Sequence, residues 1–237
     1  ASESYPLAND AILHYSFDVF SDVIIDHSYS LAHAENHGVI PVDGVCGKAG
    51  YFNNSYMIAP RPPLADDITI YFWAKFDALG SQTIVQSRTA VGSGLSVFQL
   101  NNRYRLDWRE NQVEFTGYTP VIGTWHHVCM KMNATTAVLK INGELKSTLT
   151  GTYETTQNLA STIWSGLSGT GGTPSGNILT GAIDGFQIIP RFTTDDEDTA
   201  NYKARGNLPK VGKDIIGDLI GNADTATKLA NARTITI

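Results

Sequence analysis

The chain has 237 residues, of which 42% are hydrophobic and 10% aromatic, enough to bury one large core or two small ones. Its formal net charge is -6, and it lacks the clustered lysines and arginines that carry nucleic-acid affinity, which argues against nucleic acid as a partner. No apolar run approaches the roughly 20 residues that a membrane span requires, so we expect no membrane insertion.

Short β-type runs separated by Gly, Asn, Asp and Pro extend from Ala11 to Ile189, a pattern typical of a β-sandwich or jelly roll. The run Ile68–Phe76 alternates so that one face can enter the core while the other is amphipathic, and we expect both faces to be partly covered. The run Arg103–Glu110 also alternates. Its apolar face is predicted to be core, and its polar face carries the residues Arg103, Arg105, Asp107 and Arg109.

A hairpin is predicted in the middle of the chain. The strands Trp125–Met132 and Ala137–Ile141 are followed by Asn142-Gly143, a dipeptide that tolerates positive φ at both turn positions. A tight turn there would lead directly into a strand over Glu144–Leu149.

A further strand is predicted over Ile178–Pro190, where internal glycines suggest a bulge or a close approach of another backbone. The run Thr193–Glu197 then supplies an N-cap and an acidic first turn for a short helix that reaches about Ala204. We interpret this acidic run as part of the helix start rather than as a metal site, because negative charge is favourable there by itself.

The composition changes after Gly206 to small, polar and aliphatic residues without aromatics. Such a segment cannot form its own core and needs to stack against neighbours to bury its aliphatic side chains, which implies an oligomeric or fibrous context. We therefore divide the chain into a domain at 1–205 and a C-terminal segment at 206–237.

The cysteines and histidines suggest no metal site. Cys46 and Cys129 permit at most one disulfide, which a chain of this length does not need, and we favour two buried thiols. His126 and His127 occupy adjacent strand positions and point to opposite faces, so they cannot share a metal ion. The spacing of the other histidines matches no zinc pattern.

Seven short motifs occur in the order found in the laminin G-like, concanavalin A-like jelly roll, and residues 12–197 resemble that family. The resemblance implies an all-β jelly-roll sandwich. The matching segments are Ile12–Asp18, the Asp26–Ser28 and His33–Gly38 loop, Gly47–Asn53, Ile68–Phe76, Gly123–Val128 (GTWHHV), Leu139–Gly143 and Gly181–Phe186 (GAIDGF). Gly185 departs from the family pattern, which has an acidic residue after the aspartate.

The same resemblance implies a structural calcium ion, held by Asp18 and Asp184 together with backbone oxygens. Hard cations take six or more oxygen ligands, so two carboxylates are necessary but not sufficient. The alternative is that both aspartates cap turns.

The C-terminal segment carries a second resemblance. Gly221–Ile235 (GNADTATKLANARTI) is similar to an element that recurs in the tail fibres of tailed bacteriophages. This resemblance implies a virion protein that is synthesised in the bacterial cytoplasm, with other tail-fibre subunits as partners and a homotrimer as its assembly.

Sugar recognition combines exposed aromatic faces with planar polar groups that hydrogen-bond to hydroxyls. Arg105, Asp107 and Arg109 form the polar face that we consider for ligand binding. Loop aromatics are further candidates, because binding groups gather on the loops of rigid sandwiches, although we favour packing over ligand contact for each of them. They are Tyr118, Tyr153 and Trp164.

The sequence thus predicts a phage attachment domain that binds a host cell-surface glycan or protein. One alternative is a structural or decorative fibre module without its own ligand. Another is a polysaccharide depolymerase, but retaining hydrolysis needs two carboxylates about 5 to 5.5 Å apart, and the nearest pair, Asp107 and Glu110, has the wrong parity for one strand face. We therefore expect no enzymatic activity.

Overall fold

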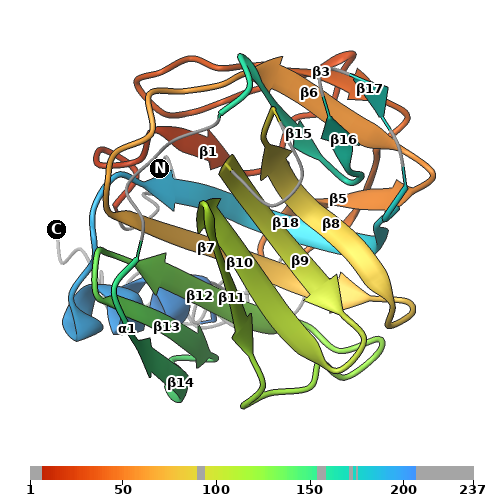
Figure 1. The fold of residues 1–237 in the computed structure, drawn as a ribbon. Coiled ribbons are helices and arrows are strands. Elements are labelled where there is room, and N and C mark those ends of the chain that lie inside the picture. Colours follow the sequence, from red (N-terminus) through yellow and green to blue (C-terminus); the bar gives the residue numbers. More distant parts are fainter. Residues whose placement is uncertain (1–6, 90–93, 154–158, 171–172, 175, 207–237) are drawn as a thin grey trace, which may run out of the picture.

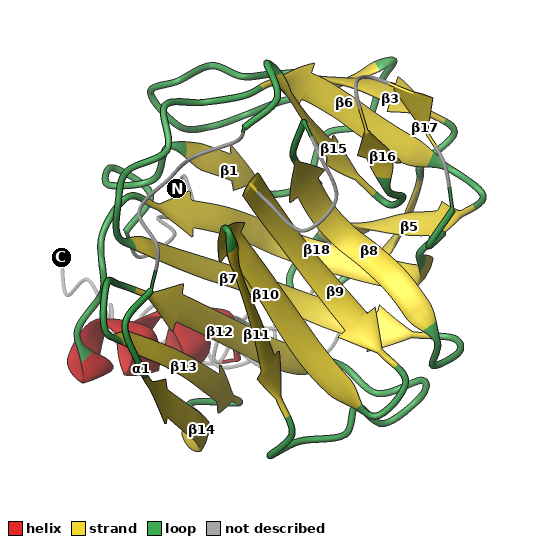
Figure 2. Cartoon of the chain, viewed as in Figure 1, coloured by secondary structure: helices red, strands yellow, loops and turns green. Residues whose placement is uncertain are grey.

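The computed structural model describes residues 7–89, 94–153, 159–170, 173–174 and 176–206. Two antiparallel sheets of eight strands each pack against one another, and a helix, α1 (Asp195–Gly206), lies beside one of them (Figure 1). Strands dominate the molecule, as Figure 2 shows. The predicted all-β jelly-roll sandwich is confirmed.

The sheet beside α1 is called the back sheet. In spatial order it contains β14 (Glu144–Thr150), β13 (Thr136–Ile141), β12 (His126–Met132), β7 (Ile68–Phe76), β18 (Thr180–Ile189), β5 (Lys48–Asn53) and β4 (Ile40–Asp43), with β1 (Leu13–Tyr15) also paired to β18.

The other sheet is called the front sheet. Its order is β11 (Asn111–Phe115), β10 (Arg103–Arg109), β9 (Gly94–Leu100), β8 (Ser81–Ser87), β15 (Thr162–Ser165), β6 (Tyr56–Pro60), β3 (Ala34–His37) and β2 (Val23–Ile24). A small separate hairpin pairs β16 (Gly169–Thr170) with β17 (Thr173–Pro174).

Strand β7 shows how alternation builds the core. Ile70 and Phe72 belong to the apolar cluster between the sheets, whereas Tyr71 lies on the opposite face and is nevertheless fully buried. The Tyr71 hydroxyl donates to Asp198 at 2.6 Å and lies 2.8 Å from the Thr193 hydroxyl, so this face is covered by the start of α1. The prediction that both faces of this strand are covered is confirmed.

The predicted hairpin joins β13 and β14. Asn142 and Gly143 have φ values of 53° and 79°, the left-handed pair that a tight hairpin turn requires. The Asn142 side chain also accepts a hydrogen bond from the His127 amide at 2.8 Å, which fixes the turn against β12.

The glycines of β18 have the two roles expected of them. Pairing between β18 and β7 shifts register between Asp184 and Gln187, and Gly185 within this bulge has a φ of 57°. A Cβ on Gly181 would collide with the carbonyl oxygen of Lys75, so this position requires glycine for close backbone approach.

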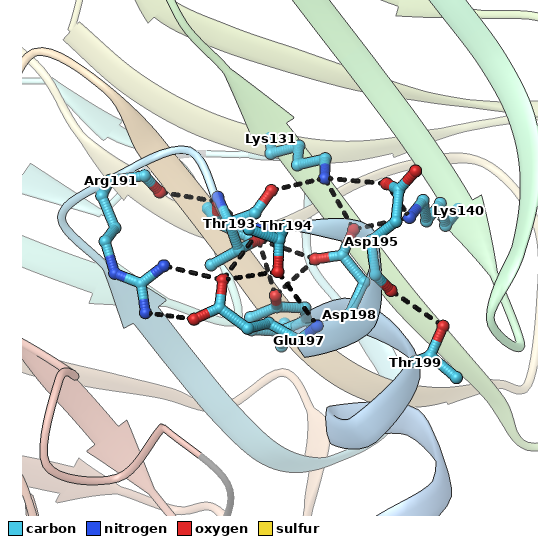
Figure 3. A network of polar contacts seen from close by, with 11 residues as sticks. Lys131, Lys140, Arg191, Thr193, Thr194, Asp195, Glu197, Asp198 and Thr199 are labelled. Atoms are coloured by element: carbon cyan, nitrogen blue, oxygen red, sulfur yellow. Dashed lines mark hydrogen bonds and ion pairs between the residues drawn. The ribbon is translucent and has the colours of Figure 1, made fainter.

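Helix α1 begins with a capping box. The Thr194 hydroxyl accepts the Glu197 amide at 3.3 Å, and the Glu197 carboxylate accepts the Thr194 amide at 2.8 Å (Figure 3). The predicted N-cap and acidic first turn are confirmed, and the helix ends at Gly206, close to the expected end.

The acidic run also attaches the helix to the back sheet. The buried carboxylate of Asp198 accepts hydrogen bonds from Lys131 of β12 and Lys140 of β13, both at 2.7 Å, and Lys140 also pairs with Asp195 (Figure 3). These contacts explain the acidic cluster structurally, as the sequence predicts.

The predictions for the cysteines and for the adjacent histidines agree with the structure. Cys46 and Cys129 are buried free thiols. His126 contacts the core hydroxyl of Tyr104, whereas His127 contacts Asn201 of α1, so the two rings do lie on opposite faces. No helix in the described part of the chain is long and apolar enough to cross a membrane.

Residues 207–237, including the fibre-like motif, lie outside the described residues, and the boundary at 206 stays a prediction.

Candidate functional site

The candidate site lies on the face of the front sheet that points away from the core. In β10, Tyr104, Leu106 and Trp108 enter the core, which places Arg105 and Asp107 on the opposite face, as their alternation predicts. Cross-strand neighbours of these residues share that face, because directly opposed residues in an antiparallel pair lie on the same side.

Strand register identifies those neighbours. Arg105 lies opposite Phe98 of β9 and Glu114 of β11, and Phe98 in turn lies opposite Thr83 of β8. Arg88 follows β8 directly and reaches the same ring. We call the set Thr83, Arg88, Phe98, Arg105 and Asp107 the arginine face.

Two guanidinium groups flank the phenyl ring of Phe98. The Arg105 group lies 5.7 Å from the ring centroid and the Arg88 group 5.9 Å from it. Phe98 is buried at 5% exposure although it faces away from the core, and both guanidinium groups lie over its ring.

Asp107 orients one of the two guanidinium groups. Its carboxylate accepts two hydrogen bonds from Arg105, at 2.5 Å from Nε and 3.0 Å from Nη2, a bidentate pair. Burial raises the pKa of Asp107, and the Arg105 hydrogen bonds only partly offset that effect. Asp107 is fully buried, so it positions and neutralises Arg105 and cannot itself face a ligand.

The second guanidinium group has no such partner. Arg88 is half-buried, forms no ion pair within the described residues, and its Nε is buried without a hydrogen-bond partner there. The Thr83 hydroxyl is likewise buried and unpartnered in the part of the chain that the structure describes. Buried polar groups normally have partners, so unsatisfied groups on one face indicate a place where a ligand or water would bind.

A bulge in β8 brings Thr83 and Arg88 to this shared face. Their separation along the chain is odd, so strict alternation would place them on opposite faces. The pairing of β8 with β9 shifts register between Thr83 and Val85, which restores Gln86 and Arg88 to the outer side. Arg88 and Phe98 are functional candidates that sequence reasoning missed, and no sequence signal marks the bulge.

Arg109 was expected on the same ligand-binding face as Arg105, but its side chain instead pairs with a neighbouring loop residue. It ends β10 with a left-handed φ of 62° and pairs with Asp66 at 2.5 Å. Trp108 donates to the Asp66 carbonyl oxygen at 2.9 Å as well, so both side chains hold the same neighbouring segment. Arg109 is 3% exposed, and its described contacts are structural.

Two of the three aromatic candidates, Tyr118 and Tyr153, pack against the core rather than beside Arg105. Tyr118 packs against the core, with its ring centroid 5.6 Å from that of His126. Tyr153 also packs against the core and donates to the Leu149 carbonyl oxygen at 3.4 Å. The backbone of Trp164 pairs with Gln86 of β8, next to the arginine face, but its side chain lies outside the described part of the structure.

The two calcium candidates hold one turn between them. Asp184 accepts the Val45 and Cys46 amides at 2.9 and 3.3 Å, and Asp18 accepts the Lys48 amide at 3.0 Å. Burial raises the pKa of Asp184 well above its usual value, and the nearby negative charge of Asp18 raises it further against the effect of the amides.

The residues around this turn fit a cation only in part. Two neighbouring carboxylates are the charge that a hard cation prefers, and such an ion would relieve their repulsion. However, the described residues contain no group of three or more His, Cys, Asp or Glu side chains arranged to hold a metal, so further ligands would have to be backbone oxygens or water. The turn-capping role is directly visible.

Similar folds occur in several solved binding domains. The binding domain of Paraclostridial Mosquitocidal Protein 1 matches with a TM-score of 0.66 at 18% identity, over 84% of this chain and 53% of that chain. The binding domain of botulinum neurotoxin DC in complex with SialylT matches with a TM-score of 0.63 at 17% identity, over 84% and 52%. Our chain thus spans about half the length of these two binding domains.

A third structure is matched almost in full. Domain 4 of AbnA, a GH43 extracellular arabinanase from Geobacillus stearothermophilus, was solved in complex with arabinotriose and matches with a TM-score of 0.65 at 17% identity. The match covers 81% of this chain and 98% of that domain. At these identities the similarity concerns the fold alone.

Sequence comparison agrees with the fold. No curated protein matches the chain. Residues 51–197, more than half of the chain, match a family described as the concanavalin A-like lectin/glucanases superfamily. This segment runs from β5 through the start of α1 and includes every residue of the arginine face. The chain therefore belongs to the concanavalin A-like lectin/glucanases superfamily.

Proposed function

We propose that this chain is a non-catalytic attachment domain of a bacteriophage tail fibre, which binds a glycan on the surface of the host bacterium. The observation that carries the binding role is Arg88 of the arginine face, a half-buried residue whose guanidinium group lies over Phe98 and whose Nε has no hydrogen-bond partner in the described residues. The lectin-type fold supports this role, since domain 4 of AbnA, a protein of the same fold, was solved with a bound saccharide.

The fibre context rests on the resemblance of Gly221–Ile235 to a recurring tail-fibre element. We include in the proposal a homotrimer, other tail-fibre subunits as partners, and a place in the virion after synthesis in the bacterial cytoplasm. A segment without aromatics that cannot form its own core supports an assembly in which neighbouring chains cover its aliphatic side chains.

We propose that the arginine face is not catalytic. Asp107, one of the two carboxylates considered for hydrolysis, is fully buried and engaged by Arg105 through both of its oxygens. A carboxylate held in this way is poorly placed to attack a sugar or activate water. Release of reducing sugar from a polysaccharide that the chain binds would contradict this part of the proposal.

A structural calcium ion at Asp18 and Asp184 is also part of the proposal, because a cation would offset the charge of the two carboxylates. Adding calcium to chelator-treated protein is expected to raise the midpoint of thermal unfolding by several degrees, and Asp18→Asn is expected to abolish that increase. An unfolding midpoint of the wild-type chain that is indifferent to calcium would leave only the turn-capping role.

The experiment that tests the attachment role is binding of the labelled full chain to bacterial cells, before and after periodate oxidation of surface sugars. We expect oxidation to abolish binding. Binding that survives oxidation but is lost on protease treatment of the cells would point to a protein receptor instead. A folded oligomer that binds no cells would favour the second candidate, a structural fibre module without its own ligand.

A further inference from the structure

The front sheet carries an unusual density of arginines for an acidic protein. Four of them lie on or directly after β8 and β10, in a chain whose net charge is -6. Three have carboxylate partners: Arg103 pairs with Glu114 at 3.1 Å, Arg105 with Asp107 at 2.5 Å, and Arg109 with Asp66 at 2.5 Å. The fourth is Arg88, which forms no ion pair within the described residues.

Arg88 is held in a position that suits an external anion. The ring of Phe98 lies under its guanidinium group, and the like charge of Arg105 lies close enough to disfavour its protonated form. Burial lowers the pKa of Arg88, an effect that the charge of Asp107 opposes. Both carboxylate oxygens of Asp107 accept hydrogen bonds from Arg105. The guanidinium group of Arg88 therefore has no ion-pair partner in the described structure.

We propose that the ligand of the arginine face is an anionic saccharide, and that Arg88 pairs with its acidic group. A guanidinium group presents a planar fork of donors that matches the two oxygens of a carboxylate or phosphate. The Thr83 hydroxyl lies directly opposite Phe98 in the register and is unpartnered in the described structure, but it is fully buried and, like Asp107, does not itself face the sugar. This inference rests on the proposed function and narrows its class of ligand.

A neutral sugar explains the same contacts less well. Its hydroxyl groups could accept hydrogen bonds from Arg88, but they would leave the positive charge uncompensated in a half-buried position. Nucleic acid offers the right charge, yet the other three arginines are already paired, and the chain as a whole is negative, so extended phosphate contacts are disfavoured.

The test uses the full chain and a panel of immobilised bacterial polysaccharides. Every carboxylate-bearing polysaccharide is presented both intact and after chemical reduction of its carboxyl groups, which keeps the sugar chain and removes the charge. A teichoic acid represents phosphate as the acidic group, and neutral polysaccharides complete the panel. The variants are Arg88→Gln, Arg88→Lys and, as the matched control, Arg103→Gln on the same face.

We expect the wild-type chain to bind acidic members of the panel. If the acidic group of the ligand is a carboxylate, reduction of the carboxyl groups should abolish binding. If it is a phosphate, the chain should bind the teichoic acid. Arg88→Gln is expected to weaken binding by about tenfold to a hundredfold, since a charged hydrogen bond contributes about 1.5 to 3 kcal/mol. Arg88→Lys keeps the charge but not the fork, so its affinity should fall between those two proteins. Arg103→Gln should stay within about twofold of wild type.

Two results would overturn the inference while leaving the attachment role intact. One is preferential binding to neutral polysaccharides, and the other is unchanged affinity of Arg88→Gln for an acidic one. Failure of the folded wild-type chain to bind both the panel and bacterial cells would instead remove the proposed function. Thermal unfolding tests whether each variant is folded. If Arg88→Gln does not fold, the Arg88→Lys variant replaces it in the test. An affinity of Arg88→Lys equal to that of wild type then counts against the inference.

Discussion

Two buried threonines show how much a hydrogen-bond partner changes the contribution of one side chain to the stability of the fold. Thr69 and Thr83 are both fully buried. The Thr69 hydroxyl donates to the Arg191 carbonyl oxygen at 2.7 Å and accepts the Thr193 amide at 3.2 Å, whereas the Thr83 hydroxyl has no partner within the described residues. Desolvating a hydroxyl without a hydrogen bond costs free energy of folding, and Thr83 bears that cost.

Replacing each threonine by valine is expected to change stability in opposite directions. Thr83→Val should raise the free energy of unfolding by about 1 kcal/mol, because it removes an unsatisfied polar group. Thr69→Val should lower it by about 1 to 3 kcal/mol, because it leaves two buried backbone groups without their partner. Chemical denaturation of both variants measures the difference, and equal losses would show that the Thr83 hydroxyl is satisfied in solution.

Buried histidines make the stability of the protein sensitive to mild acid. Burial lowers the pKa of His127 to about 4, against the effect of its hydrogen bond to Asn201, and the unfolded chain keeps a value near 6.5. The unfolded state therefore binds more protons between these two values, so the stability due to neutral His127 is complete above about pH 6.5 and is lost as pH falls toward 4.

We accordingly expect the free energy of unfolding to decrease as the pH falls from 7 toward 4. The variant His127→Gln retains a hydrogen-bonding side chain but cannot titrate, so its decrease should be shallower. Urea denaturation of both proteins at several pH values tests this. Parallel curves would mean that His127 titrates equally in the folded and unfolded states.

Helix α1 is attached to the back sheet by a buried ionic network around Asp198, together with the packing of Tyr202 against Trp73. Lys131 and Lys140 are buried side chains of neighbouring strands, and both donate to Asp198, which is itself buried (Figure 3). The Tyr71 hydroxyl donates to the same carboxylate. Removing one member of such a buried network leaves the opposite charges uncompensated, which is more destabilising than losing an exposed pair.

Asp198→Asn is therefore expected to lower the free energy of unfolding by about 3 to 5 kcal/mol. Asp196→Asn is the matched control, because it makes the same change in the same helical turn at an exposed position and should alter stability by less than about 0.5 kcal/mol. Equilibrium denaturation distinguishes the two variants. A small effect of Asp198→Asn would show that Asp195 alone can compensate both lysines.

At the scale of the whole molecule, the sandwich and the C-terminal segment differ in what they can do alone. Both apolar clusters are built from residues between Leu7 and Ile189, and α1 closes the back sheet by Gly206. The remaining residues contain no aromatics and supply too little apolar surface for a core of their own. Folding and assembly are thus expected to reside in separate parts of the chain.

A chain that ends at residue 206 is expected to unfold cooperatively and to be monomeric, whereas the full chain should form a trimer. Light scattering coupled to size-exclusion chromatography reports both masses, and circular dichroism reports folding of the shorter chain. A trimeric shorter chain would place the assembly surface on the sandwich, and a monomeric full chain would contradict the fibre assembly that we propose.

Features that depend on neighbouring residues could be predicted from the amino-acid sequence alone. Alternation placed Tyr104, Leu106 and Trp108 in the core, Asn142-Gly143 specified the hairpin, and the Thr194–Glu197 capping box specified the start of α1. Each depends on backbone preferences or contacts within a few positions, which a local pattern reports directly. The order of the family motifs extended these local predictions to the correct fold class.

The composition of the candidate site depends on contacts that form only in the folded protein. The sequence identified Arg105 and Asp107 but not Arg88, because a bulge in β8 changes the parity that alternation assumes. It also did not identify Phe98, whose place opposite Arg105 is set by the register between β9 and β10. It also could not show that Arg109 would pair with Asp66, or that Asp198 would meet Lys131 and Lys140. These contacts depend on strand register and sheet packing between distant segments, which the free energy of the whole fold sets and no local pattern contains.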